Sequence, residues 1–308
     1  MVTSLPAPSP GGPLPGIPVI VNPGARSARA GLRLDDIRAL SPQVEMRETG
    51  GPGDASRLAE ELARAGAPLI VAAGGDGTMN EVVTGIVRAG ALGRTVLGVL
   101  PTGTMNVFAA ELGLPSARLD LCWQAITGGL ARAVDLWRLN DTYFVQLAGV
   151  GFDAAIIRET SWESKKRFGP LSYLMSGWKV LGRRATVMMV QAAGREAVSG
   201  TVVLIGNGRN YGGPFPLFPH ALPGDGLLDV VVMPGQGWKH FYAVGRALLS
   251  GHYTAKRGVH YFQTDRLRVE AADAVPYEVD GELAGAASVL DLSKHGSLTV
   301  MGAKPVPL

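Results

Sequence analysis

Short apolar runs alternate with amphipathic stretches through the first part of the chain. The runs are rich in Val, Ile and Leu, are short enough to be buried strands, and cover residues 17–22, 68–73 and 95–100. The stretches that follow them have apolar residues near helical spacing and predict helices over residues 27–40, 79–90 and 105–114. This alternation predicts βαβ units and a parallel sheet, which binds its ligand beyond the carboxyl ends of its strands.

The pattern changes further along the chain, where strands with glycine-rich connections predominate. We predict strands over residues 143–152, 185–192, 200–208, 226–233, 265–271, 276–285 and 297–302. Such a series is typical of a mostly antiparallel, β-rich domain. The sequence therefore predicts the following organisation: a flexible tail (1–16), an α/β domain (17–137), a β-rich domain (138–295), and a final segment that is a candidate to return to the α/β domain (296–308).

The composition supports a folded protein with a sizeable core. The chain has 308 residues, of which 46% are hydrophobic and 18% charged, and a net charge of +3 gives no reason to expect a nucleic-acid partner. Its single cysteine, Cys122, excludes an internal disulfide and fits a reducing cytosol. Because the first residues lack a signal-peptide pattern and no run of about 18 apolar residues occurs, we expect a cytoplasmic protein without a membrane span.

One segment, residues 158–184, differs from its surroundings in charge. It contains seven Lys and Arg residues against two Glu residues, interleaved with Trp, Phe, Tyr and Met. Basic residues with interfacial aromatics suit contact with an anionic membrane surface. The same composition also suits a helix that packs on the sheet and turns its basic face to water. The sequence leaves both interpretations open.

The stretch AAGGDGTMNEVV, residues 72–83, holds three glycines between a predicted strand and a predicted helix. Thr78 and Glu81 match the capping-box pattern, which predicts that Thr78 marks the start of the helix. The N–H groups from Gly75 to Thr78 would then lie at the positive end of the helix and suit an anion. Asp76 would repel a phosphate unless it binds a divalent metal or handles a proton, and the alternative is a glycine turn with Asp76 as a local cap.

Two further loops repeat this arrangement. PTGTMN (101–106) and VNPGARS (21–27) also follow predicted strands, so the three loops would converge on one edge of the sheet. The chain contains no Gly-Lys pair, which excludes a P-loop, and no G-x-G-x-x-G after the first strand, which argues against a Rossmann dinucleotide site. It also lacks the G-x-S-x-G elbow of hydrolases and the H-E-x-x-H pattern of zinc proteases.

GGDGTMNE, followed about twenty residues later by LPTGTMNVFA, resembles the diacylglycerol kinase catalytic family, which includes bacterial lipid kinases and the sphingosine kinases. The resemblance extends over nearly the whole chain through NPGAR, GDA, GVGFDA, GNGRNYGGP, LPGDGLLDV and VDGE. It implies a fold of two parts. The first is an α/β domain of the kind found in NAD kinases and diacylglycerol kinases, which would bind the nucleotide. The second is an antiparallel β-rich domain, which would bind the lipid.

The resemblance also implies a role for each matching position. ATP would be bound by residues of the glycine loops and their neighbours: Asn22, Pro23, Gly24, Ala25, Arg26, Thr49, Gly74, Gly75, Asp76, Gly77, Thr78, Met79, Asn80 and Thr104. Asp225 would hold a structural magnesium ion together with the carbonyl groups of Leu222 and Leu227. Glu282 would be the catalytic proton acceptor for the lipid hydroxyl, and Asp76 would order metal and phosphates.

From the residues alone, Asp225 in P-G-D-G is equally a turn aspartate, and Glu282 a solvated glutamate after a tight hairpin turn at Asp280-Gly281. Two positions depart from the family's pattern. Val107 stands where a second acidic residue is common, and Arg26 stands where glycine is usual. These departures bear on how the metal and the nucleotide would be held.

Three hypotheses about function remain. The first is a lipid kinase that uses ATP and Mg²⁺, associates peripherally with the membrane surface and phosphorylates a lipid hydroxyl, as on diacylglycerol or a sphingoid base. The second is a kinase with a soluble acceptor, of the NAD kinase type. The third is a nucleotide-binding regulator without catalytic activity. The sequence does not identify the acceptor, and a homodimer is a candidate assembly.

Overall fold

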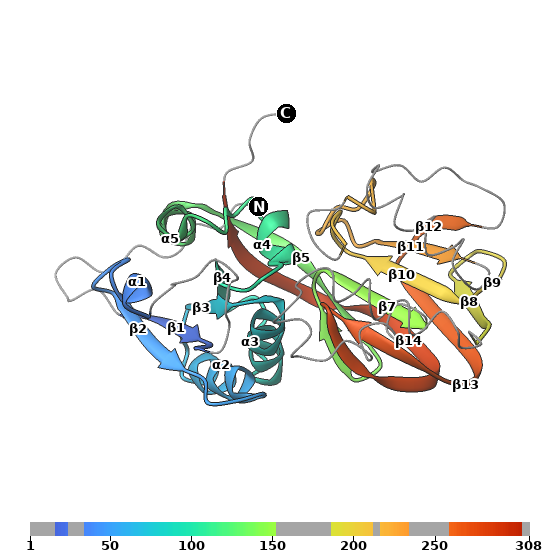
Figure 1. The fold of residues 1–308 in the computed structure, drawn as a ribbon, viewed down its shortest axis with the longest axis horizontal. Coiled ribbons are helices and arrows are strands. Elements are labelled where there is room, and N and C mark those ends of the chain that lie inside the picture. Colours follow the sequence, from blue (N-terminus) through green and yellow to red (C-terminus); the bar gives the residue numbers. More distant parts are fainter. Residues whose placement is uncertain (1–15, 24–33, 152–185, 212–215, 234–258, 304–308) are drawn as a thin grey trace. The chain divides into compact units, whose positions relative to one another are not determined.

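The computed structural model in Figure 1 describes residues 16–23, 34–151, 186–211, 216–233 and 259–303. Within these residues the chain forms two compact units. The first unit runs to Val134 and resumes at Gly296, and the second runs from Asp135 to His295. Each unit is described by itself below.

The first unit is built on a parallel sheet. The strands lie in the order β2 (Val44–Glu48), β1 (Ile17–Val21), β3 (Leu69–Gly74) and β4 (Val96–Pro101). The end of β14 (Glu282–Gly302) adds a further parallel strand, with Val300 opposite Leu97. Every residue of β3 is buried, as expected for a central strand covered on both faces.

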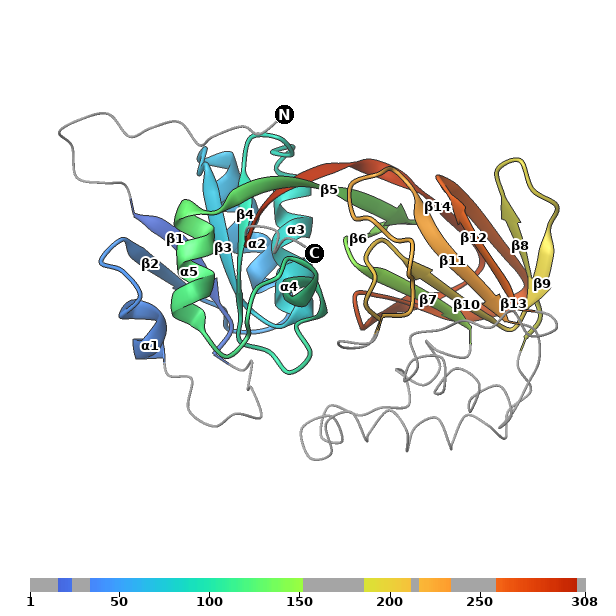
Figure 2. The same ribbon diagram turned by 90° about the horizontal axis from the view of Figure 1, so that it is seen from above.

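Helices cover both faces of this sheet. Figures 1 and 2 show α2 (Asp54–Arg64) and α3 (Asp76–Arg88) on one face and α5 (Leu119–Gly128) on the other. Two short helices complete the unit, α1 (Leu34–Arg38) and α4 (Val107–Glu111). Helix α2 buries only small side chains, which are Ala55, Ser56, Ala59 and Ala63. Small side chains let the backbones of α2 and α3 approach closely.

The second unit is antiparallel. Its main sheet has the order β12-β11-β10-β7-β13-β14, while β8 pairs with the other end of β13, β9 with β8, and β5 with β14 and β6. The strands not yet introduced are β5 (Leu130–Leu139), β6 (Thr142–Phe144), β7 (Leu147–Gly151), β8 (Met188–Ala192), β9 (Val198–Gly200), β10 (Val202–Gly206), β11 (Leu228–Met233), β12 (His260–Thr264) and β13 (Arg266–Val279). Trp137, Phe144 and Phe262 lie in the core with aliphatic side chains from these strands.

The predicted fold class is confirmed, with a parallel α/β unit and an antiparallel β-rich unit. The strands predicted at 17–22, 68–73 and 95–100 match β1, β3 and β4 within one residue at each end. The helices predicted at 79–90 and 105–114 match α3 and α4, which begin or end a few residues away. Part of the helix predicted over 27–40 and all of the basic segment 158–184 lie outside the described residues.

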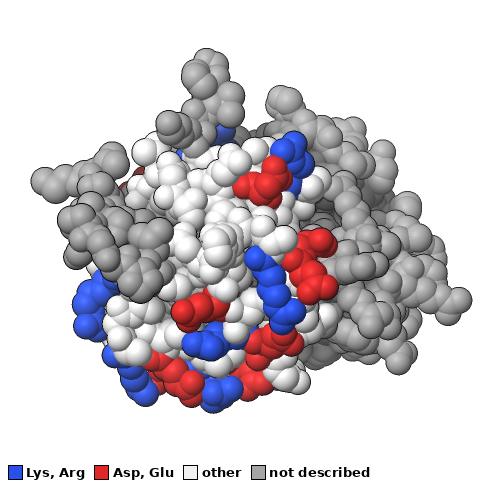
Figure 3. Space-filling view, turned by 90° about the vertical axis from the view of Figure 1, so that its left-hand side faces the viewer, with Lys and Arg blue, Asp and Glu red and all other residues white. Residues whose placement is uncertain are grey.

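Charged side chains of both signs are interspersed on the face drawn in Figure 3. Oppositely charged side chains of the first unit also form ion pairs. Two of these pairs join Arg57 to Glu61 and Arg38 to Asp35. All four side chains are more than half exposed, so each pair contributes little to stability. Among the described residues, no helix is both long and apolar enough to cross a membrane.

The contact between α2 and α3 predicts a cost for adding one methyl group. A Cβ atom on Gly85 of α3 would lie 2.3 Å from the Ser56 carbonyl oxygen and 2.7 Å from the Ala59 Cβ atom. We expect Gly85→Ala to lower the free energy of unfolding by about 1–3 kcal/mol, because the helices would have to separate. Chemical denaturation measures this change.

Gly128→Ala is the matched control for that measurement. Gly128 also lies in a helix, α5, and a Cβ atom there would meet nothing within 4 Å. Alanine stabilises a helix relative to glycine by up to about 1 kcal/mol, so this variant should be at least as stable as the unchanged protein. Equal effects of the two substitutions would contradict the packing argument.

Candidate functional site

Four loops of the first unit leave the same edge of its sheet. Asn22 follows β1, Thr49 follows β2, Gly75 follows β3 and Thr102 follows β4, and the four strands are parallel. The chain goes from β1 to β2 on one side and returns to β3 on the other side of β1. Such a reversal opens a crevice beyond the carboxyl ends of the strands, which is where open α/β sheets bind ligands.

Asn22 and Thr78 meet at this reversal. The Asn22 side chain donates a hydrogen bond from Nδ2 to Oγ1 of Thr78 over 3.1 Å, and its backbone N–H donates to the carbonyl of Ala73 over 3.1 Å. The structure thus brings together residues that lie 56 positions apart in sequence. Pro23 follows directly, whereas residues 24–26 of the same loop, including Arg26, lie outside the described residues.

Helix α3 begins at Asp76, three residues before the start that the sequence predicted. Gly75 is its N-cap, and the first helical hydrogen bond runs from the Met79 N–H to the Gly75 carbonyl over 3.0 Å. The N–H groups of Gly75, Asp76, Gly77 and Thr78 therefore have no carbonyl partner within the helix. They lie at the positive end of its dipole, as an anion site requires. Of the two remaining predicted ligands here, Met79 is buried and Asn80 half-buried.

The predicted capping box is wrong. Thr78 is the third residue of α3, and its hydroxyl accepts the hydrogen bond from Asn22. Glu81 bonds to the start of α2 instead of to its own helix. The physical reason is that Gly75 caps α3 with extended backbone and no side-chain hydrogen bond, which frees both polar side chains for tertiary contacts.

The loops after β3 and β4 touch through their backbones. The N–H groups of Thr102 and Gly103 donate to the carbonyl of Gly74 over 3.0 and 3.2 Å. A Cβ atom on Gly103 would lie 2.3 Å from the Cα atom of Gly75, so only glycine fits at position 103. Asn106, which has a left-handed φ of 50°, closes the second loop by accepting from the Gly103 N–H over 3.0 Å. Thr104, at the tip of this loop, is exposed.

The carboxylate of Asp76 joins the same two loops. Its Oδ1 accepts a hydrogen bond from the Phe108 N–H over 3.2 Å, at the start of α4. Burial raises the pKa of Asp76, and the backbone N–H groups near residues 106–108 oppose that rise. Val107, which stands where relatives of this pattern often have an acid, is buried in the core of the unit. It therefore adds no carboxylate beside Asp76.

In the second unit, Glu282 stands beside a two-residue hairpin turn, as predicted. Asp280 and Gly281 have φ values of 47° and 82°, and Val279 pairs with Glu282 across the turn. Positive φ at both central residues matches the twist of the flanking strands. Glu282 is exposed at the first position of β14. The turn thus presents its carboxylate to solvent from a fixed backbone.

The side chain of Asp280 fixes this turn to the neighbouring backbone. The residue is buried, and its carboxylate accepts hydrogen bonds from the N–H groups of Val145, Gln146 and Leu147 over 3.2, 3.0 and 3.1 Å. Its own N–H donates to the carbonyl of Leu147 over 2.9 Å. Three backbone donors to one carboxylate anchor the hairpin to the start of β7.

The loop that holds the predicted metal ligands folds into a turn. The N–H of Asp225 donates to the Leu222 carbonyl over 3.2 Å, and the N–H of Leu227 donates to Oδ1 of Asp225 over 2.9 Å. Buried Asp135 holds this loop by accepting the Gly226 N–H over 2.6 Å, and Lys294 forms an ion pair with Asp135 over 2.5 Å.

The donors that this turn offers suit a hard divalent cation. Carboxylate and backbone carbonyl oxygens are the ligands that Mg²⁺ and Ca²⁺ prefer, so Asp225 with the carbonyls of Leu222 and Leu227 fits magnesium in donor type. Nearby Asp229 is buried and accepts hydrogen bonds from Tyr261 and Gln263. Burial raises the pKa of Asp229, and the negative charge of Asp225 adds to that rise. A cation beside Asp225 would relieve this repulsion.

Sequence reasoning missed the contacts by which several polar residues organise these loops. Glu81, Asn106, Asp135, Asn207 and Asp280 all use buried or half-buried polar groups to hold the backbone. Buried Asn207 accepts from the indole N–H of Trp137 and donates to the carbonyls of Asp135 and Val145. Polar residues within or beside glycine-rich motifs were the available signal, but except for Asn106, which bonds to Gly103, their partners lie too far along the chain to be inferred.

Comparison with known proteins gives two family matches that together span most of the chain. The model of the diacylglycerol kinase catalytic domain matches residues 17–139, and that of the YegS C-terminal NAD kinase beta sandwich-like domain matches residues 146–302. A diacylglycerol kinase of Bacillus subtilis (strain 168) is 31% identical over 236 residues, which cover 76% of this chain and 77% of the relative. A protein of Yersinia enterocolitica named "Probable lipid kinase YegS-like" is 32% identical over 252 residues, covering 80% and 83%.

A solved structure has the same fold. The crystal structure of a diacylglycerol kinase from Bacillus anthracis superposes with a TM-score of 0.70 and covers 93% of this chain and 96% of its own. The two sequences are 20% identical in that superposition, so the likeness is one of fold.

The anchor under the hairpin can be tested with Asp280→Asn. Asparagine keeps the shape and tolerates the left-handed φ of this position, but its amide group cannot accept all three backbone hydrogen bonds. We expect the free energy of unfolding to fall by about 1–3 kcal/mol, because a buried N–H loses its partner. Chemical denaturation measures the loss. A variant as stable as the unchanged protein would contradict the anchoring role.

Proposed function

Because this chain belongs to the diacylglycerol kinase catalytic family, we propose that it is a lipid kinase that transfers the γ-phosphate of ATP to a lipid hydroxyl, as on diacylglycerol or a sphingoid base. The observation that carries the proposal is the start of α3, where four N–H groups and Asp76 stand at the reversal point of a parallel sheet. This arrangement suits a phosphate chain, and the names of the relatives support a lipid acceptor.

The first unit would bind ATP. Backbone N–H groups from Gly75 to Thr78 would face the phosphates, since Gly75 has no side chain to keep an anion at a distance. Asn22, Thr49 and Thr104 would add polar contacts from the neighbouring loops. Fixed N–H donors need no reorganisation during transfer, so the chain contributes mainly positioning and charge stabilisation.

The acidic residues would have separate tasks. Asp225, with the carbonyls of Leu222 and Leu227, would hold magnesium in the second unit. Magnesium, when bound with the nucleotide, neutralises negative charge on the phosphates. Asp76 would order the nucleotide's metal and phosphates, because it stands among the N–H groups at the start of α3. Glu282 would accept the proton of the lipid hydroxyl, since it is an exposed carboxylate on an anchored turn.

The same proposal places the protein at a membrane surface, where its acceptor resides. The composition of residues 158–184 supports contact with anionic lipid, because basic residues are interleaved with aromatic ones. A soluble acceptor is less well supported, since the relatives are named lipid kinases or diacylglycerol kinases.

Labelled ATP offered with a panel of acceptors tests this function. The panel contains diacylglycerol, a sphingoid base, ceramide, phosphatidylglycerol and a polyprenol in mixed micelles, with NAD as the soluble acceptor. We expect label in one lipid class. Glu282→Gln should lower kcat by about 10²–10⁴-fold with ATP binding unchanged, because the general base is lost. Transfer to NAD but to no lipid would overturn the proposal, and unchanged turnover in Glu282→Gln would remove its role as base.

Asp76→Asn should separate activity from stability. We expect kcat to fall by roughly 10²-fold or more, since metal and phosphates lose their carboxylate. Stability at neutral pH should not fall, because the amide oxygen still accepts the Phe108 N–H and the buried charge is gone.

The pH dependence of that stability difference follows from the raised pKa of Asp76. A raised pKa means that the ionised carboxylate weakens the fold at neutral pH. The unchanged protein should therefore gain stability relative to Asp76→Asn as pH falls through the raised pKa. Denaturation curves of both proteins between neutral and acidic pH measure the difference. A loss of stability in the variant at neutral pH would show that Asp76 serves mainly to hold the fold.

A further inference from the structure

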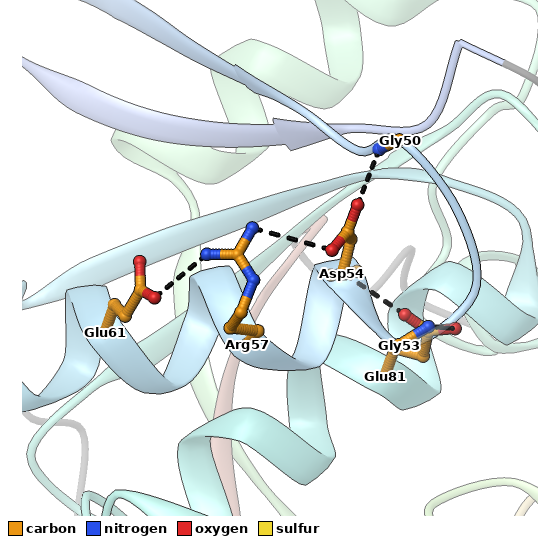
Figure 4. Close-up of polar contacts among 7 residues, drawn as sticks. Gly50, Gly53, Asp54, Arg57, Glu61 and Glu81 are labelled. Carbon is orange, nitrogen blue, oxygen red and sulfur yellow. Dashed lines mark hydrogen bonds and ion pairs between the residues drawn. The ribbon is translucent and has the colours of Figure 1, made fainter.

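Glu81 caps a helix other than its own. It lies on α3, at the end of GGDGTMNE, and its two carboxylate oxygens reach the start of α2 (Figure 4). Oε1 accepts the N–H of Gly53 over 3.0 Å, and Oε2 accepts the N–H of Ala55 over 3.1 Å. Gly53 is the N-cap of α2 and cannot cap with a side chain. The α3 carboxylate therefore fills the position that an N-cap side chain would take.

The loop held by this contact carries Thr49. It reads TGGPG between the end of β2 and the start of α2, so three of its five residues are glycines. A glycine-rich segment loses much conformational freedom on ordering and needs fixed contacts. The Thr49 N–H donates to the Val21 carbonyl over 2.9 Å, and the Gly50 N–H donates to the Asp54 carboxylate over 2.8 Å (Figure 4). Glu81 secures the other end of the loop.

Helix α3 thus has two connected tasks. Its first residues present the N–H groups proposed to face the phosphates, and Glu81 lies one turn later on the same helix. Gly85, a further turn along, lets α2 lie close against α3. Displacing the start of α2 relative to the phosphate-facing N–H groups would therefore break the bonds of Glu81 or separate two closely packed helices.

We propose that Glu81 is a positioning residue for the nucleotide. It keeps the Thr49 loop in register with the start of α3, and its negative charge occupies the start of α2, so that the phosphates are received at α3 alone. The proposal rests on the proposed function, because it requires that ATP bind at this edge. Glu81 itself would touch neither nucleotide nor lipid.

Full-length Glu81→Ala and Glu81→Gln test this proposal. Glu61→Gln is the control, since Glu61 lies on the exposed side of α2 and pairs only with Arg57 among the contacts in Figure 4. Three quantities are measured for each protein: hydrogen exchange without nucleotide, the affinity for a fluorescent ATP analogue, and the kinetic constants for ATP and for the lipid found in the panel.

Glu81→Ala should lose exchange protection at residues 50–56 and raise Kd and KM for ATP by roughly tenfold, the equivalent of one charge-assisted hydrogen bond. The values of kcat and of KM for the lipid should stay within about twofold. Glu81→Gln should show a smaller change, because its amide oxygen still accepts one of the two N–H groups. Glu61→Gln should behave as the unchanged protein.

Two results would overturn the proposal while leaving the proposed function intact. One is a loop that loses protection in Glu81→Ala with Kd for ATP unchanged, which would make Glu81 a helix cap only. The other is a loss of kcat in Glu81→Ala with the lipid found in the panel while KM for ATP stays constant. Absence of ATP binding in the unchanged protein would instead overturn the proposed function, and this inference with it. Since Glu81→Gln retains one hydrogen bond, it serves as the test if Glu81→Ala does not fold.

Discussion

The backbone contact between Gly75 and Gly103 is the constraint on which the polar edge of the first unit depends. The two loops can touch only because Gly103 has no side chain, since a Cβ atom there would overlap the Cα atom of Gly75. With the loops so close, Asp76 can reach the Phe108 N–H at the start of α4. The N–H groups at the start of α3 therefore stand in a fixed relation to the loop after β4. Glycine lets the two loops approach closely, and hydrogen bonds from polar side chains then fix their positions.

Carboxylates that accept backbone N–H groups recur in both units. In the first unit, Asp76 accepts the N–H of Phe108, and Glu81 accepts N–H groups at the start of α2. In the second unit, Asp135 accepts the N–H of Gly226, and Asp280 accepts the N–H of Leu147, where β7 begins. A carboxylate can accept several hydrogen bonds, and charged hydrogen bonds contribute about 1.5–3 kcal/mol each. Burial opposes this gain, as the raised pKa of Asp76 shows. Glycine-rich loops lose much conformational entropy when they become ordered. Carboxylates that bond to their backbone can fix them without bulky side chains that would block a ligand.

Local patterns in the sequence were enough to predict the strands with strong apolar runs and the convergence of the glycine loops. They did not predict α2, because that helix buries alanine and serine instead of large apolar residues. Strand β2 was also missed, since it is a short edge strand with mostly exposed, charged positions. The prediction of a capping box was wrong for a related reason. T-x-x-E is a local pattern, but in the structure Thr78 bonds to Asn22 and Glu81 bonds to the start of α2.

The position of Glu81 shows why a motif cannot be divided into catalytic and structural residues from its letters. In GGDGTMNE the two acids are five positions apart on one helix, yet Asp76 stands at its start and Glu81 bonds to another helix. A carboxylate at a helix N-terminus and a phosphate at a helix N-terminus satisfy the same N–H groups and the same dipole. Within the part of the chain that the structure describes, Glu81 supplies an anion to the start of α2, and no side-chain hydrogen bond caps the start of α3. On this argument, the helix whose first N–H groups lack such a cap is the one prepared for the phosphates.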